Sequence, residues 1–135
     1  MAAMAMTAGI TPSALADQAG YNADYTLFRT TGNVRCMVSD DRVACERMVP
    51  GGFAAAPASG SGGNWPTASV TADGKFSWEA TPIGGSGNEI AMVNGQPYPS
   101  HDWTLLLTTE GTRLSHKGNN GGMNISIDGT TVTPY

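Results

Sequence analysis

The chain has two cysteines, Cys36 and Cys45, which lie nine positions apart around the pair Asp40-Asp41. If the two aspartates form the turn of a β-hairpin, opposed residues have numbers that sum to 81, and the cysteines face each other. In such a hairpin their pair is of the non-hydrogen-bonded type, with Cα atoms roughly 4.5 Å apart, a separation that a disulfide accepts. The spacing therefore predicts a hairpin closed by a Cys36–Cys45 disulfide; two free buried thiols are the alternative.

The same register gives the predicted hairpin two different faces. The face of the cysteines is mostly apolar and carries two further opposed pairs, Val34 with Arg47 and Val38 with Val43. The other face carries the opposite charges of Arg35 and Glu46, and Met37 opposite Ala44. A shift of one residue would move every side chain to the wrong face, so the pattern specifies the register.

The rest of the chain is typical of an all-β domain. Glycine is abundant, at 18 residues, and only 13% of the residues are charged, which suits a fold rich in turns. Short β-branched or alternating runs follow one another from Tyr25 onward, and no segment after the first sixteen residues keeps a helical period. The sequence predicts a small antiparallel sandwich or barrel of roughly seven to nine strands.

Turn signals divide these runs into hairpins. Three further turns are expected, at Asp73-Gly74, Glu110-Gly111 and Asp128-Gly129. Asn88 to Val93 is expected to be a short strand that ends at Asn94-Gly95. Residues 50–66 are rich in Gly, Ala, Ser and Pro without periodicity and are expected to form a long surface loop, either mobile or functional.

The N-terminal residues 1–16 are small and apolar and end in Ala14-Leu15-Ala16, which fits the A-x-A rule for signal peptidase. No Lys or Arg precedes the apolar run, so we expect the basic region of a signal peptide to lie upstream of Met1. An N-terminal helix packed on the domain is the alternative. The sequence thus predicts a signal peptide over 1–16, a flexible segment over 17–24 and a secreted β-domain over 25–135.

Charge and composition exclude several classes of partner. The net charge of −4 argues against nucleic acid, because binding to phosphates needs a basic face. No other apolar run approaches the roughly 20 residues of a membrane span. Two cysteines and two distant histidines, His101 and His116, lack the spacing of a zinc site. No cofactor or metal is predicted, and the expected partner is a protein or glycan at the cell surface.

The segment around the cysteines resembles a motif of small secreted actinobacterial proteins, mycobacterial ones among them; it reads LFRTTGNVRC…VACE and fits the pattern Gly-Asn-[Ile/Val]-x-Cys…Cys. The C-terminal half is similar to the same group, so the resemblance extends from Tyr25 to about Asp128. Many of those proteins have a second disulfide across the later hairpin, where this chain has leucines. The resemblance implies secretion, the fold class and the disulfide, and it implies no activity.

His101-Asp102 is the pair that most resembles catalytic residues, with Ser100 adjacent. Neighbouring residues on a strand point to opposite faces, so these three cannot form a triad among themselves. With a turn at Glu110-Gly111, Trp103 pairs with about residue 118, and His116 lies near Leu105 rather than near His101. The sequence therefore favours solvated or loop histidines, and a small secreted hydrolase that uses His101 is the alternative function.

Aromatic residues are the better candidates for a binding surface. Trp65 and Tyr98 lie beside prolines in expected loops, so we expect them to be exposed, with His101 and Trp103 close to Tyr98. The other interpretation is that these aromatic rings seal the open ends of a sandwich. The sequence predicts a secreted, non-catalytic binding or interaction module of the cell envelope or the extracellular space; a purely structural protein without a pocket is a third hypothesis.

Overall fold

The computed structural model describes residues 24–60, 62–83, 89–118 and 121–135, and these residues form eleven β-strands and no helix. The strands are β1 (Thr26–Arg29), β2 (Val34–Val38), β3 (Arg42–Arg47), β4 (Thr67–Thr71), β5 (Phe76–Glu79), β6 (Ile90–Ala91), β7 (Pro97–Ser100), β8 (Trp103–Thr108), β9 (Gly111–His116), β10 (Gly122–Ser126) and β11 (Val132–Pro134).

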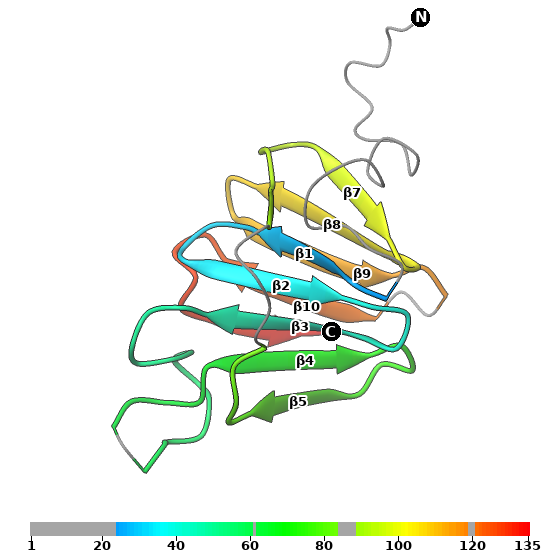
Figure 1. The fold of residues 1–135 in the computed structure, drawn as a ribbon. Helices are drawn as coiled ribbons and strands as arrows, with labels where there is room; N and C mark the ends of the chain where they lie inside the picture. The colour runs from blue at the N-terminus through cyan, green and yellow to red at the C-terminus, as the bar shows by residue number, and fades with distance from the viewer. Residues whose placement is uncertain (1–23, 61, 84–88, 119–120) are drawn as a thin grey trace, which may run out of the picture.

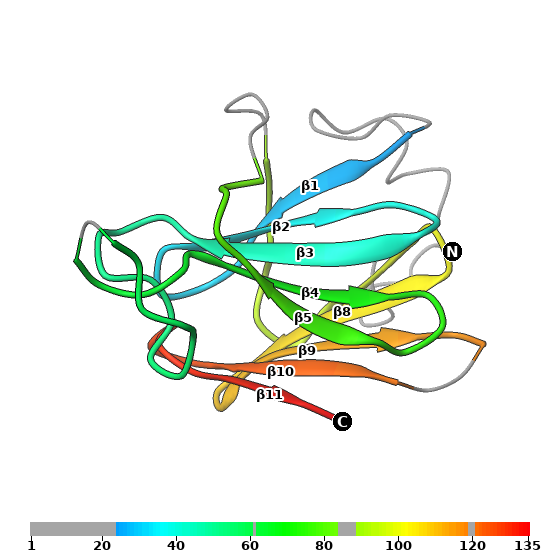
Figure 2. The ribbon, with the colours of Figure 1, turned by 90° about the horizontal axis from the view of Figure 1, so that it is seen from below.

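The strands form two sheets that pack face to face as a sandwich (Figures 1 and 2). The first sheet has the order β5-β4-β3-β2-β1-β6, and the second has the order β11-β10-β9-β8-β7. Every pairing is antiparallel except that of β6, which runs parallel to β1. The predicted all-β sandwich is confirmed, although the described residues form more strands than the seven to nine expected.

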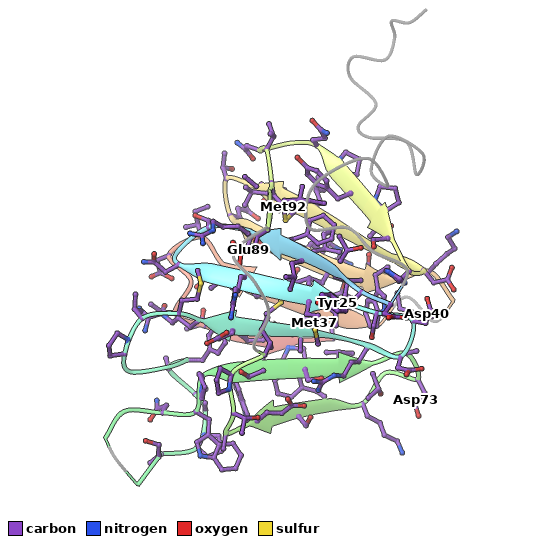
Figure 3. The ribbon with its side chains drawn as sticks, viewed as in Figure 1. Tyr25, Met37, Asp40, Asp73, Glu89 and Met92 are labelled. Carbon is purple, nitrogen blue, oxygen red and sulfur yellow. A yellow bond between two sulfur atoms is a disulfide. The ribbon has the colours of Figure 1, made fainter. Side chains whose placement is uncertain are left out.

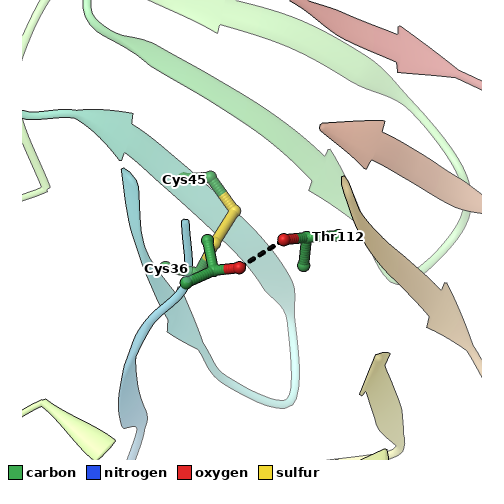
Figure 4. Close-up of a disulfide and its surroundings, with 4 residues drawn as sticks. Cys36, Cys45 and Thr112 are labelled. Atoms are coloured by element: carbon green, nitrogen blue, oxygen red, sulfur yellow. Dashed lines mark hydrogen bonds between the residues drawn. A yellow bond between two sulfur atoms is a disulfide. The ribbon is translucent and has the colours of Figure 1, made fainter. Parts of the chain in front are cut away.

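The predicted cysteine hairpin is β2–β3, in the predicted register. Cys36 pairs with Cys45, Val38 with Val43 and Arg35 with Glu46. The two sulfur atoms are bonded, and the Cα atoms of the cysteines lie 4.0 Å apart. Near the disulfide, the hydroxyl groups of Thr30 and Thr112 form a hydrogen bond that connects the two sheets (Figure 4).

The core lies between the inner faces of the two sheets. The first sheet contributes small and β-branched side chains beside the disulfide, whereas the second contributes larger ones. The largest fully buried side chains are Trp103, Tyr98, Phe28, Phe53, Leu27, Leu105, Leu114, Met123, Ile125, Val34 and Val38. Leu27 is the exception among them, since it pairs with Met37 on the outer face of the first sheet.

The loop over residues 50–66 is more tightly bound to the domain than the sequence predicted. Phe53 is fully buried and its ring lies 5.9 Å from that of Trp78. A β-bridge joins Ala58 to Asn64, and the side-chain amide of Asn64 donates to the carbonyl of Phe53 at 2.9 Å. The segment packs on the core through Phe53, which the sequence gives no reason to select, and through the partly buried Trp65.

Two predicted turns are wrong by one residue. In the β4–β5 hairpin, the amide of Thr71 donates to the carbonyl of Lys75 at 3.0 Å, so the connection has three residues that end in Gly74 rather than two. In the β8–β9 hairpin, Thr108 pairs with Gly111, so the turn is at residues 109–110. The Thr108 hydroxyl caps this turn by accepting from the amide of Glu110 at 3.1 Å.

The sequence interpretation did not identify β7, because it contains two prolines. Pro97 and Pro99 alternate with residues whose backbone pairs with β8, so neither proline interrupts the ladder. Of the strand expected over 88–93, only Ile90–Ala91 is paired, and Asn88 lies outside the described residues. The predicted signal peptide (1–16) and residues 17–23 of the predicted flexible segment also lie outside them.

Candidate functional site

The predicted aromatic surface is not present at Tyr98 and Trp103. Both side chains are buried in the core, and the Tyr98 ring packs edge-on against Phe28 at 5.6 Å between centroids. The Tyr98 hydroxyl accepts a hydrogen bond from the amide of Val93 at 2.9 Å. Trp65 is half-buried and packs against the core. The expected exposure of Tyr98 is therefore wrong, because prolines that look like loop residues lie in an edge strand instead.

His101 lies in the tight turn between β7 and β8. Both turn residues have positive φ, 51° at His101 and 65° at Asp102, as a type I′ turn requires. The His101 side chain is only 6% exposed, and its Nδ1 lies 3.0 Å from Oδ1 of Asp40 in the β2–β3 turn. This contact joins the two sheets at one end of the sandwich, where Figure 3 shows Asp40.

Among the described residues, the serine adjacent to His101 is not placed to act with the His101–Asp40 pair as a nucleophile. Ser100 is buried, and its hydroxyl donates to Thr26 Oγ1 at 2.9 Å. His116 does not oppose Leu105 as predicted. It opposes Trp103, with 4.8 Å between ring centroids, because the β8–β9 turn begins one residue earlier. The histidines therefore join structural elements, and the arrangement shown fulfils only one of the geometric requirements of acyl transfer.

The outer face of the first sheet carries paired charges. Glu89 is at the centre of this network: its carboxylate lies 3.2 Å from Arg29 and 3.1 Å from Arg35, and Arg35 also lies 3.2 Å from Glu46. Burial by itself raises the pKa of Glu89, but hydrogen bonds from the two arginines outweigh it, so the pKa is lower than usual. Glu89 and Met37 are visible on this face in Figure 3.

The outer face of the second sheet is different in character, and we call it the polar face. The register brings Leu106 of β8, Arg113 of β9, Asn124 of β10 and Thr133 of β11 into one row across four strands. A hollow of about 380 Å³ is centred on this row. Its lining is polar and apolar in about equal parts, and is formed by Leu106, Thr108, Glu110, Gly111, Thr112, Arg113, Asn124, Ile125, Ser126, Thr131 and Thr133.

Gly111 lines the hollow and allows β9 and β10 to approach each other closely. Gly111 has a φ of 140°, and a Cβ atom there would lie 2.0 Å from the carbonyl oxygen of Ile125. No other residue fits this position without moving β10. At Gly111 the lining of the hollow, which we call its floor, is main chain only, because glycine has no side chain.

An aromatic ring and a cation lie beside the hollow. The guanidinium of Arg113 lies 4.3 Å from the centre of the Tyr135 ring, a cation–π contact. The Tyr135 hydroxyl donates to the carbonyl of Leu114 at 2.8 Å, which fixes the ring over Gly122. No carboxylate of the described residues lies within ion-pair distance of Arg113. Its donors are therefore available to a bound group.

A second hollow, of about 500 Å³, lies beside the loop over residues 50–66. Its wall includes Arg47, whose guanidinium donates to the carbonyl of Gly52 at 2.8 Å. The Nε atom of Arg47 is buried without a hydrogen-bond partner. Glu46, Ser59 and Asn64 also line it, together with glycine, proline and apolar side chains. The side chains of Arg47 and Asn64 donate to backbone carbonyls of the loop, at Gly52 and Phe53, so these polar groups hold the loop in place.

Sequence reasoning did not identify the residues of the polar face. The signal was present as polar residues at alternate positions near the end of the chain, in RLS (113–115), NIS (124–126) and TVT (131–133). Alternation alone indicates only that one side of a strand faces water. That these side chains form one row follows from the registers of three strand pairs, which the sequence does not specify.

The described residues contain neither a candidate metal site nor a candidate membrane span. Nowhere among them do three or more His, Cys, Asp or Glu side chains gather closely enough to hold a metal ion. The same part of the chain contains no helix with the length and apolar character of a membrane span.

Comparison with known protein families, with curated proteins and with solved structures finds no match for this chain. The resemblance to small secreted actinobacterial proteins therefore stays a prediction.

Proposed function

We propose that this protein is a secreted, non-catalytic binding module, and that its polar face binds a neutral, polyhydroxylated ligand, a glycan of the cell envelope or the extracellular space. The observation that carries the proposal is the hollow on the second sheet, whose lining brings hydroxyl, amide and guanidinium groups together with apolar surface. Ligand sites are concave surfaces with convergent polar groups. Such a mixed lining complements a sugar, which has hydroxyl groups on its edges and C–H groups on its faces.

Each part of the polar face has a role in this binding. Asn124 and Thr133 offer both donors and acceptors, which sugar hydroxyls need because each of them also donates and accepts. Arg113 supplies a rigid set of donors that its contact with Tyr135 holds in place. Part of the Tyr135 ring is exposed and provides an apolar surface for the C–H groups of a sugar ring.

A hydrolase that uses His101 is the weaker hypothesis. The contact with Asp40 supplies one of the orienting groups that a general base needs. The adjacent hydroxyl of Ser100 is buried and already bonded to Thr26, and His101 itself is 6% exposed. A binding function requires no such group and uses surface that is open to solvent.

Secretion is part of the proposal and is supported by the disulfide. Disulfides form and persist in oxidising compartments and are rare in the cytosol. The Cys36–Cys45 bond is fully buried between the sheets. The predicted signal peptide over residues 1–16 points to the same compartment.

Calorimetric titration with soluble neutral oligosaccharides tests the proposed function. The double variant Asn124→Ala/Thr133→Ala removes two hydrogen-bonding side chains from the polar face, and we expect its affinity to fall about tenfold or more, since each such bond contributes about 0.5–1.5 kcal/mol. Ser77→Ala is the matched control, because Ser77 is exposed on the outer face of the first sheet. Absence of binding across neutral glycans, or equal affinities in the two variants, would contradict the proposal.

A further inference from the structure

Strand β5 is a free edge of the first sheet. It pairs with β4 on one side, and no strand of the described residues pairs with it on the other (Figure 1). Its inward side chains, Phe76 and Trp78, are half-buried and pack edge-on against each other at 5.1 Å between centroids. An edge of this kind presents unpaired backbone groups, which are a template for pairing with another chain.

The other edges of the described sheets are blocked. Pro97 and Pro99 lie at the positions of β7 whose backbone faces away from β8, so this edge lacks two N–H donors. Pro134 does the same for β11, because the neighbouring Tyr135 exchanges both backbone hydrogen bonds with Gly122. Strand β6 has only two residues. Strand β5 contains no proline and has four residues, so its edge is open to pairing.

The backbone groups that β5 presents can be identified from its pairing with β4. The carbonyl of Lys75 accepts from the amide of Thr71, so Lys75 faces β4. Because the direction alternates along an antiparallel strand, the N–H and C=O groups of Phe76 and Trp78 face outward. Those of Ser77 face inward to Ser69.

We propose that β5 pairs with β5 of a second copy of this chain, antiparallel about a two-fold axis at Ser77. In this register Phe76 opposes Trp78 of the partner, and the residue numbers of opposed positions sum to 154. The outward N–H and C=O groups of Phe76 and Trp78 then form four backbone hydrogen bonds between the copies. The first sheets of the two protomers become one continuous sheet.

The side chains of β5 are complementary to themselves in the same register. Lys75 lies opposite Glu79 of the partner on the outer face, so two pairs of opposite charge form across the axis. Lys75 is exposed, and Glu79, although bonded to Arg42, keeps 29% of its side chain exposed. On the inner face, Phe76 and Trp78 form cross-strand aromatic pairs. The complementarity of charge is the reason to assign a second copy, rather than an unrelated strand, to this edge.

Sedimentation equilibrium of the full chain tests the pairing through a charge swap. We expect a monomer–dimer equilibrium, and we expect K75E and E79K each to weaken it about tenfold, because two opposite-charge pairs become like-charge pairs. The double variant K75E/E79K restores opposite charges and should recover the dimer, although its contact between residue 79 and Arg42 stays lost. A mixture of the two single variants should likewise form a mixed dimer.

A second measurement locates the interface and controls for folding. The amides of Phe76 and Trp78 should become protected from hydrogen exchange as concentration rises, while the Ser77 amide is protected throughout. F76P removes an outward donor and F76A keeps it while losing the same ring, so only F76P should abolish that protection. A wild-type monomer up to about 0.5 mM, where even a weak complex is populated, would overturn the proposal. A dimer that is indifferent to K75E, or a K75E/E79K variant as weak as K75E, would overturn it as well.

Discussion

The outer faces of the two sheets differ although the sheets have the same architecture. On the first sheet, arginine and glutamate side chains satisfy one another: Arg35 contacts two carboxylates, and Arg42 contacts Glu79 and Ser69. On the second sheet, the central row is neutral apart from Arg113, which contacts an aromatic ring rather than a carboxylate. A hollow lies on the second face, with a floor of main chain at Gly111.

The polar side chains of the two faces differ in their bonding partners. A guanidinium that contacts one or two carboxylates has few donors left for a ligand, so the first face contributes mainly to stability. Among the described residues of the second face, no protein group hydrogen-bonds to the side chains of Asn124 and Thr133, so they can bind a ligand. Substitutions on the first face should therefore change the free energy of unfolding, whereas those on the rim of the hollow should change binding.

The largest expected effect concerns the floor of the hollow. Gly111→Ala places a Cβ atom 2.0 Å from the Ile125 carbonyl oxygen at a φ of 140°. We expect it to lower the free energy of unfolding by at least about 3 kcal/mol, because it combines a clash with backbone strain. Gly95→Ala, at a φ of 84° with nothing within 4 Å, is the control and should cost about 1 kcal/mol. Urea denaturation measures both values, and equal costs would show that the floor does not need glycine.

The second effect concerns the disulfide of the first sheet. Replacement of both Cys36 and Cys45 by Ala should lower the free energy of unfolding by about 2.5 kcal/mol, because the closed loop is short and its entropy gain is modest. The remaining core should keep the fold, which circular dichroism and the thermal midpoint would show. Total loss of folding would mean that the first sheet depends on the bond far more than its loop length implies.

The third effect compares two arginines on the first face. Arg35→Glu should cost about 2 kcal/mol, because Arg35 is 14% exposed and contacts both Glu46 and Glu89. Arg29→Glu should cost about 1 kcal/mol or less, because Arg29 is 50% exposed and its charge is screened. Denaturant titrations of the two variants at the same ionic strength give the comparison. Equal costs would argue that Arg35 does not bridge two carboxylates.

The smallest effect is the acid sensitivity of the first face. The pKa of Glu89 is lower in the folded protein than its ordinary value of 4.5, so its ion pairs stabilise the fold above that pH. This stabilisation is lost as the pH falls through the lowered folded pKa. Glu89→Gln should be less stable at pH 7, by about 1 kcal/mol, and its stability should fall less between pH 5 and 3. Parallel pH profiles for the two proteins would contradict the assigned role.

The difference between the faces also limits what the sequence predicts. The β2–β3 hairpin could be predicted residue by residue, because opposed cysteines, opposed charges and matched valines all require one register. The hairpin around Thr108 and Gly111 offers no such set of pairs. A glycine there looks like a turn residue, although the structure needs it within β9 for the approach of β10.

The burial of Tyr98 shows a second limit. Prolines on both sides of Tyr98 favour a loop in the sequence. In the structure they lie in an edge strand, where they remove the N–H donors that would face away from the sheet. The ion pairs of Arg29 and Arg35 with Glu89 join residues 60 and 54 positions apart, and alternation of residue types gives no sign of them. The polar face has the same origin, since its row crosses four strands.

The most direct test of the proposed function is the location of chemical-shift changes in two-dimensional NMR spectra during titration with a neutral oligosaccharide that binds. We predict that the changes are confined to the polar face, at Thr108, Arg113, Asn124, Thr133 and their neighbours, with the amides around Glu89 unmoved. Changes centred on the outer face of the first sheet, or on the hollow beside Arg47, would contradict the assignment of binding to the second sheet.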